Sequence, residues 1–350
     1  MKIRKAAMLL LMCSFSVLTL EAGDIRVGKY AGEFMAVGVG GRALGLGGAG
    51  TALASDVTAG YWNPAGLARI MYPEFALMHD ERFGSLVNYD YGAIAVPYGA
   101  NDSLLYGAST LALSIFRLGV DGIPDTRGAW ADSNGNGLFD EQNVRPDLSR
   151  ISYFNTTDWA AYISYAKQSS RDFYYGASVK LIRRNLGDAH GTGFGFDIGV
   201  LYTPYENLFL GAAVQDVTTT LVAWSTGTNE LISPTLKLGS AYETRFFGGK
   251  IVPTVDADIR FEGRAYAAMA HVGPVSLDYH GGVEYEFRNV IAIRVGYNEV
   301  RNLTLGAGIH LRKLDVDYSF AKFNGDDQLG NSHRISIRFR LEEDRFKRGN

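Results

Sequence analysis

Residues 314–320 read LDVDYSF, and apolar and polar side chains alternate along the whole stretch. Successive side chains of a β-strand point to opposite faces, so a period of two predicts a strand with one apolar and one polar face. The same alternation recurs in VDADIRF (255–261) and in RISIRFRL (334–341). The sequence therefore predicts an all-β fold in which many strands have two chemically different faces.

Counting the alternating segments outward from this stretch gives about fourteen candidate strands, each long for a soluble sheet. Short turn signals such as PYEN, EFRN and EVRN separate several of them, while the long polar insertions 118–157, 218–234 and 324–331 separate others. The candidates are 74–81, 86–98, 103–117, 158–168, 172–185, 192–204, 207–217, 235–244, 250–262, 276–287, 290–299, 302–311, 313–323 and 332–341.

Long strands joined alternately by tight turns and long loops are typical of a transmembrane antiparallel β-barrel. Aromatic residues near strand ends favour it too, because such barrels carry aromatic girdles at both membrane interfaces. The candidates for these girdles are Tyr89, Tyr91, Tyr98, Tyr202 and Tyr205. An even strand number places both termini in the periplasm. The alternative on fold is an exported soluble β-protein, since a β-sandwich also alternates.

The N-terminus predicts export. Lys2, Arg4 and Lys5 precede an apolar run from Ala6 to Leu20, the layout of a secretory signal peptide over residues 1–22. A retained anchor is the alternative, although the run is short for a membrane span. The one cysteine, Cys13, lies inside this segment, which excludes disulfides and thiolate chemistry from the mature chain. A net charge of −3 gives no basic surface for nucleic acid.

Residues 23–72 do not alternate and are rich in glycine and alanine. Gly45, Gly47 and Gly50 have dinucleotide-fingerprint spacing, but neither the preceding strand nor the acidic residue about 20 positions on is present. Short helices are expected near Ala49–Ala54 and in PAGLARI, where Pro64 suits the first helical position. A small-residue leader before a barrel predicts a plug inside the lumen, where Arg42 and Asp56 pair with lumen charges.

The stretch GRALGLGGAGTALASDVTAGYWNPAGLA (41–68) resembles the N-terminal signature of the PorV/PorQ family of outer-membrane proteins, a branch of the FadL-like barrels. The matching features cover about thirty residues. They are Gly41-Arg42, Leu44–Ala49, Ala54–Asp56 and Asn63-Pro64-Ala65 followed by Leu67. The resemblance implies a FadL-like barrel with Asn63-Pro64-Ala65 in the lumenal hatch. The charged tail, 342–350, departs from barrels that end on a terminal aromatic residue.

The barrel is expected over residues 73–341, and the polar faces of its strands supply charges to the lumen. These charges are of both signs, which predicts pairing with one another and with the plug rather than an ion-selective filter. The lumen charges are Lys180, Asp197, Asp256, Asp258, Arg260, Arg294, Asp315, Asp317, Arg338 and Arg340.

The long insertion 118–157, expected to be external, contains DSNGNGLFDEQN. Its D-x-N-x-N-G order places oxygen ligands at the spacing of an EF-hand-type calcium loop. The proposed ligands are Asp132, Asn134, Asn136, the carbonyl of Leu138, Asp140 and Glu141. The usual twelfth-position glutamate is replaced by Asn143. The alternative is a turn-rich surface loop, because Asn-Gly pairs are ordinary turn chemistry.

No enzyme motif is present: the six histidines are scattered, and no H-E-x-x-H or G-x-S-x-G occurs. The resemblance to PorV-like proteins implies a component of protein secretion and surface attachment, of type IX kind, with outer-membrane lipid, secretion proteins and exported cargo as partners. The alternative function is a FadL-like transporter of hydrophobic small molecules across the outer membrane. No nucleic-acid partner is expected.

Overall fold

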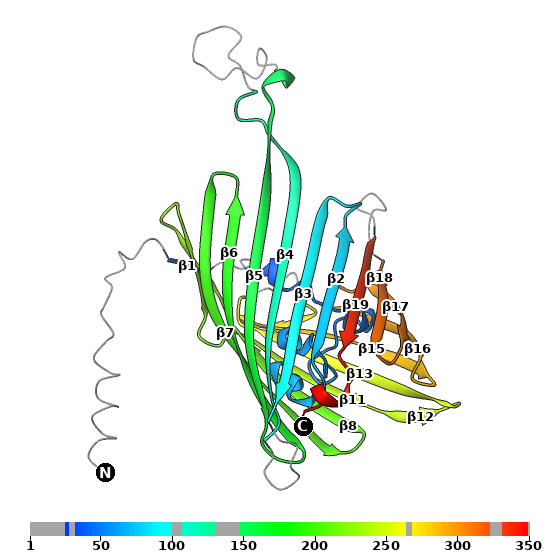
Figure 1. Ribbon diagram of the computed structural model, residues 1–350. Helices are drawn as coiled ribbons and strands as arrows, with labels where there is room; N and C mark the ends of the chain where they lie inside the picture. Colours follow the sequence, from blue (N-terminus) through cyan, green and yellow to red (C-terminus); the bar gives the residue numbers. More distant parts are fainter. Residues whose placement is uncertain are drawn as a thin grey trace, which may run out of the picture.

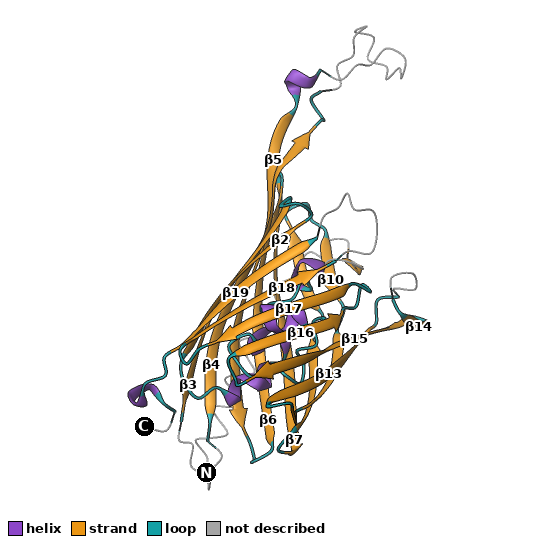
Figure 2. Ribbon diagram, turned by 90° about the vertical axis from the view of Figure 1, so that its right-hand side faces the viewer, coloured by secondary structure: helices purple, strands orange, loops and turns teal. Residues whose placement is uncertain are grey.

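The computed structural model describes residues 25–27, 32–99, 107–129, 147–263, 268–322 and 331–348. Within these ranges almost all regular structure is β-strand, and most of the short helical segments lie near the N-terminus (Figures 1 and 2). Among the described residues, no helix is both long enough and apolar enough to span a membrane. The predicted all-β class is confirmed.

Fourteen of the described strands pair antiparallel with two neighbours each and form a closed barrel, as the sequence predicts. The ring closes where β19 pairs with β2, with Phe339 opposite Phe75. In chain order the strands are β2 (Glu74–Arg82), β3 (Val87–Tyr98), β4 (Ser109–Asp125), β5 (Ser152–Gln168), β6 (Phe173–Leu186), β7 (Ala189–Tyr205), β8 (Leu208–Gln215), β11 (Thr235–Tyr242), β13 (Gly249–Arg260), β15 (Val275–Phe287), β16 (Ile291–Tyr297), β17 (Leu303–His310), β18 (Leu314–Ala321) and β19 (Ser332–Arg340).

Shorter strands and helices lie at the two ends of the barrel. β9 pairs with β7 and with β10, and β1 lies parallel to β10. β12 and β14 extend the hairpins of β13 and β15. Their bounds are β1 Ile25–Val27, β9 Thr220–Trp224, β10 Asn229–Ile232, β12 Thr244–Phe246 and β14 Ala270–Val272, and the short helices η3 and η5 span Leu148–Arg150 and Asp344–Phe346.

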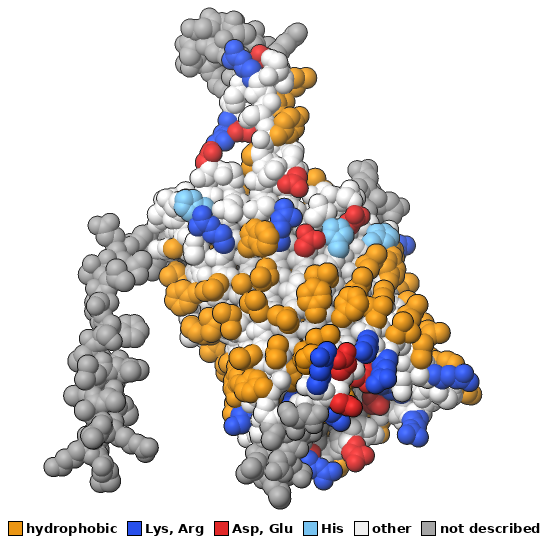
Figure 3. All heavy atoms as spheres, viewed as in Figure 1, with side chains coloured by type: hydrophobic (Ala, Val, Ile, Leu, Met, Phe, Trp, Pro, Cys, Tyr) orange, Lys and Arg blue, Asp and Glu red, His pale blue; other side chains and the backbone are white. Residues whose placement is uncertain are grey.

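The barrel is polar inside and apolar outside, because the two faces of each strand alternate. In β18, Asp315 and Asp317 are buried toward the lumen, whereas Tyr318 is 38% exposed on the outer face. Figure 3 shows the outward apolar side chains gathered into a broad band around the middle of the visible face. A soluble protein rarely exposes an apolar patch of this extent, so the outer face is suited to an apolar surrounding.

The two ends of the barrel differ. Short turns such as 206–207, 288–290 and 311–313 lie at the end where the C-terminus also lies (Figure 1). At the opposite end, β4 and β5 extend past their neighbours as a two-stranded ribbon, since β3 pairs with β4 only up to Val120 and β6 with β5 only up to Thr156. We term these the turn end and the ribbon end.

Two sequence predictions about local structure are wrong. Tyr89 and Tyr91 are buried in the lumen rather than placed in a girdle, because they share the inward face of β3 with Ala93 and Ala95. Tyr98, Tyr202 and Tyr205 do lie exposed near the turn end. Residues Ala49–Ala54 form turns instead of a helix, because the Thr51 N–H donates to Asp256 and its carbonyl accepts from Asn63.

Candidate functional site in the barrel lumen

Residues 32–72, which we term the plug, run through the lumen from the ribbon end toward the start of β2 at the turn end (Figures 1 and 2). The plug contains only short helical pieces, and most of its side chains are buried. These pieces are η1 (Glu33–Met35), α2 (Gly41–Gly45), α3 (Ala59–Trp62) and η2 (Pro64–Arg69). Helix α2 packs on β17 and β18, whereas η2 packs on β5, β6 and β7, so the plug contacts distant parts of the ring.

Asn63 joins the plug to itself and to the wall. Its side-chain oxygen accepts a hydrogen bond from the Ala65 N–H at 3.1 Å and so caps η2, with Pro64 at the first helical position. Its amide nitrogen donates to the carbonyl of Thr51 at 2.8 Å and to that of Val200, on β7, at 3.0 Å. Asn63 is completely buried, and both its amide nitrogen and its side-chain oxygen form hydrogen bonds inside the protein.

Wall glycines make room for the plug backbone. A Cβ on Gly199 would lie 2.1 Å from the Asn63 side-chain oxygen, and one on Gly176 would lie 2.5 Å from the Pro64 carbonyl carbon. On β8, a Cβ on Gly211 would lie 2.2 Å from the Thr51 carbonyl oxygen. These separations are far below contact distance, so the plug lies directly on glycine backbone at three successive strands. The sequence analysis did not identify this set.

Arg42 links the plug to a second part of the wall, at β15. Its Nη2 lies 2.7 Å from the carboxylate of Glu284, on β15, and its Nε donates to the same carboxylate at 3.0 Å. Arg294 also donates to Glu284 at 2.6 Å and continues the network to Asp317. Next to Arg42, the Gly41 N–H donates to the Ser336 hydroxyl at 2.9 Å. The predicted Gly41-Arg42 pair is thus hydrogen-bonded to two strands of the C-terminal half, β15 and β19.

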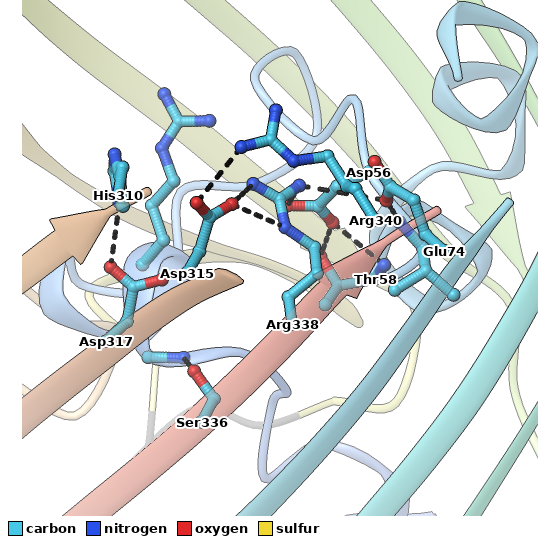
Figure 4. Close-up of polar contacts among 12 residues, drawn as sticks. Asp56, Thr58, Glu74, His310, Asp315, Asp317, Ser336, Arg338 and Arg340 are labelled. Carbon is cyan, nitrogen blue, oxygen red and sulfur yellow. Dashed lines mark hydrogen bonds and ion pairs between the residues drawn. The ribbon is translucent and has the colours of Figure 1, made fainter. Parts of the chain in front are cut away.

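Asp56 forms the second ionic contact of the plug, with Arg338 on β19 at 2.8 Å (Figure 4). Arg338 also binds Asp315, which Arg340 contacts at 3.1 Å. Burial alone would raise the pKa of Asp56, but Arg338 and hydrogen bonds from Thr58 outweigh burial and hold the pKa below its usual value. Asp56 therefore stays ionised in the closed lumen.

The remaining predicted lumen charges form two further clusters. Lys180 lies between Asp197, at 2.8 Å, and Asp216. Asp258 binds Lys237 and, at 3.1 Å, Arg260, and Asp256 accepts from the plug at the Thr51 N–H. All ten predicted lumen charges have a partner among the described residues. Their titratable partners that the sequence did not indicate are Glu74, Asp216, Lys237, Asp278, His280, Glu284, Glu299 and His310.

A cavity of about 200 Å³ remains between plug and wall. Its plug side is largely apolar and includes Met35, Tyr61 and Trp62, while its wall side carries charged groups such as Lys237 and Glu299. His280 also lines the cavity, and its Nδ1 is buried with no hydrogen-bond partner among the described residues. The arrangement suits a small molecule that has an apolar body and a polar end.

The wall beside this cavity is irregular. β7 pairs with β8 toward the turn end and with β9 toward the ribbon end. Between these two pairings, the segment Asp216–Thr219 leaves the regular ladder. Asp216 and Thr219 both have positive φ, at 56° and 60°, which is uncommon for residues other than glycine. Asp216 lines the cavity, so the irregular segment and the cavity are in contact.

The predicted calcium loop, with Asp132, Asn134, Asn136, Leu138, Asp140 and Glu141, lies outside the described residues. It stays a prediction. The signal peptide predicted over residues 1–22 also lies outside them. Within the described part of the chain, no group of three histidine, cysteine, aspartate or glutamate side chains is arranged to hold a metal ion.

Comparisons with known proteins bear on the fold. A model of the uncharacterised protein family UPF0164 matches residues 15–123, less than a third of the chain. No curated protein matches. Similar solved structures include the Ralstonia pickettii toluene transporter TbuX, with a TM-score of 0.55 and 13% identity over 87% of this chain and 98% of that chain.

Two further solved structures are similar in the same way. The Pseudomonas putida toluene transporter TodX has a TM-score of 0.55 and 14% identity over 86% of this chain and 96% of its own. A Pseudomonas aeruginosa FadL homologue has a TM-score of 0.51 and 12% identity over 87% of this chain and 98% of its own. At these identities the likeness establishes a shared FadL-like barrel architecture. The PorV/PorQ name suggested by the sequence remains a resemblance.

Proposed function

We propose that the chain is an outer-membrane channel that admits small hydrophobic molecules carrying a polar or charged end. The observation that carries the proposal is the cavity between plug and wall, which has an apolar side formed by Tyr61 and Trp62 and a charged side that includes Lys237. The likeness in fold to two toluene transporters supports a transport role for such a lumen. The proposal adopts the transporter alternative in preference to the secretion function.

The outer face supports the placement in a membrane. Along β3, the outward residues between Asp90 and Tyr98 are Gly92, Ile94 and Val96, and the same level is apolar on the neighbouring strands. Eight residues of strand span about 27 Å. At the usual tilt of about 40° this corresponds to roughly 20 Å of membrane depth, close to the apolar band of outer-membrane barrels. The ribbon end then faces outward, and the turn end, where the C-terminus lies, faces the periplasm.

The test is uptake by whole cells. The full chain is produced in the outer membrane of a host that lacks its own hydrophobic-solute channels, and uptake of radiolabelled decanoate is followed. We expect faster uptake than in the empty host, and reduced uptake with Lys237→Met, which removes one of the cations that line the cavity. Lys250→Met is the matched control, because Lys250 pairs with Glu286 away from the cavity lining. Uptake equal to that of the empty host would refute the proposal.

The secretion function remains a second candidate because of the ribbon. Beyond Val120 and Thr156 the ribbon has two strand edges without a described neighbour, and Leu148 and Tyr153 are 73% and 70% exposed. Open strand edges are surfaces on which another polypeptide can pair. If the ribbon receives exported proteins, its removal should abolish surface attachment of secreted cargo in the native host and leave decanoate uptake unchanged. Unchanged attachment would exclude this role.

A further inference from the structure

A row of polar and aromatic side chains crosses the outer face of the barrel at the border of the apolar band nearest the ribbon end. We term it the boundary row. Its members lie in register on six consecutive strands, β2 to β7. They are His79, Asp90, Arg117, Trp159, Arg183 and Thr192. Figure 3 shows charged side chains of both signs gathered along this border.

The rows on either side differ sharply in character. Two residues toward the turn end, the outward positions in register hold no polar side chain: Leu77, Gly92, Ile115, Ala161, Leu181 and Phe194. Two residues toward the ribbon end, each position except one glycine is polar: Glu81, Asn88, Gly119, Thr157, Asn185 and His190. The boundary row is therefore the border between the apolar band and the polar part of the outer face.

The two arginines of the row are positioned on either side of Trp159. The guanidinium of Arg117 lies 6.0 Å from the centre of the Trp159 ring, and it bends toward the ribbon end over Gly119, where a Cβ would lie 2.7 Å from its Nη2. The missing side chain at Gly119 thus leaves a shallow place in which this guanidinium lies. Such bending of a cation out of the apolar band is typical of membrane interfaces.

The boundary row carries two arginines, Arg117 and Arg183, but only one carboxylate, Asp90. Asp90 holds Arg117 at 3.5 Å and His79 at 2.7 Å, and it is itself 47% exposed. Arg183 donates to the Thr192 hydroxyl at 2.9 Å, and no carboxylate pairs with Arg183 in the described part of the chain. The exposed Trp159, at 41%, gives the row an amphipathic ring between the two cations.

We propose that the boundary row binds the phosphate-bearing headgroup of an anionic lipid in the outer leaflet. Arginine matches the geometry of phosphate oxygens, and the apolar row beneath, with Ile115 and Leu181, receives the acyl chains of the same lipid. A zwitterionic lipid offers the same chains with no net charge, so it is held less firmly. This inference rests on the proposed membrane placement.

The experiment measures lipid retention by native mass spectrometry of the full mature chain in a non-ionic detergent. Phosphatidylglycerol and phosphatidylcholine with identical chains are titrated in turn. We expect the wild type to prefer phosphatidylglycerol. Arg117→Gln with Arg183→Gln should reduce this preference about fivefold per arginine, or about twenty-five-fold for both. The control, Arg245→Gln with Arg288→Gln, removes two exposed arginines near the turn end and should keep the preference.

Heat-modifiable migration confirms that each variant is folded. An equal preference in the wild type and the Arg117/Arg183 variant, or an equal loss in the control, overturns the inference. Displacement of the lipid by excess inorganic phosphate also overturns it, since that result describes a free-anion site. A mature wild type that stays soluble without detergent refutes the membrane placement itself, whereas a detergent-requiring protein without lipid preference refutes only the headgroup site.

Discussion

Arg42 and Glu284 are 242 residues apart in the chain, yet the guanidinium of one binds the carboxylate of the other at 2.7 and 3.0 Å inside the barrel. Glu284 is almost completely buried, so its charge depends on this contact and on Arg294. The plug is thereby fastened to β15, four strands along the ring from β7, to which Asn63 is hydrogen-bonded.

Arg42→Met should loosen the plug without unfolding the barrel. A charged hydrogen-bonded contact contributes about 1.5–3 kcal/mol, so the open fraction should rise roughly tenfold to a hundredfold. Single-channel conductance in planar bilayers is the measurement. Arg127→Met, which removes an exposed ion pair with Asp125 on the ribbon, is the control and should leave conductance unchanged. Equal conductance of wild type and Arg42→Met would show that this contact does not hold the plug.

Gly176→Ala should displace the plug, because its new Cβ would lie 2.5 Å from the backbone of Pro64, which cannot move independently of η2. Gly92→Ala is the matched control, since its Cβ meets Leu77 at an ordinary 3.5 Å. Trypsin cleavage after Arg69 reports exposure of the plug. We expect rapid cleavage only in the Gly176 variant, and protection in both variants would contradict direct plug contact.

Asn63→Ala removes one accepted and two donated hydrogen bonds at a buried position and should cost about 2–4 kcal/mol. Asn63→Asp keeps the cap on Ala65 but cannot donate to Thr51 and Val200. Both variants should therefore lower the urea midpoint of unfolding in detergent. A midpoint unchanged in Asn63→Asp would mean that the link to β7 is dispensable.

The ion pair of Asp56 predicts a lumen that stays closed in mild acid. Because Arg338 holds the folded pKa of Asp56 below its usual value, the stabilisation is fully present above the ordinary carboxyl pKa of about 3.9 and is lost as the pH falls through the lower folded pKa. Conductance attributable to Asp56 should thus be flat from about pH 5 to 8. Asp56→Asn should raise conductance across that whole range, and an Asp56-dependent rise between pH 5 and 6 would contradict the pair.

The fold was predictable because one strand face is apolar on every wall strand, and that pattern is local. The alternation of Val283, Glu284, Tyr285 and Glu286 also places both glutamates on an inward face, so this signal was available for the missed partner of Arg42. Asp216 carries no such signal, since it lies where the ladder of β8 breaks. The glycines under Asn63 and Pro64 could not be assigned, because their role depends on contacts between distant segments.

The closing seam of the ring also has a consequence for biogenesis. β19, the last of the described strands in chain order, pairs with β2, and this pairing brings Arg338 to Asp56. The plug precedes every wall strand in the chain, so it leaves the ribosome long before its counter-ions exist. The contact of Asp56 with Arg338 therefore forms only when the final seam closes, and an assembly intermediate trapped before β19 arrives would lack this contact and have an open strand edge.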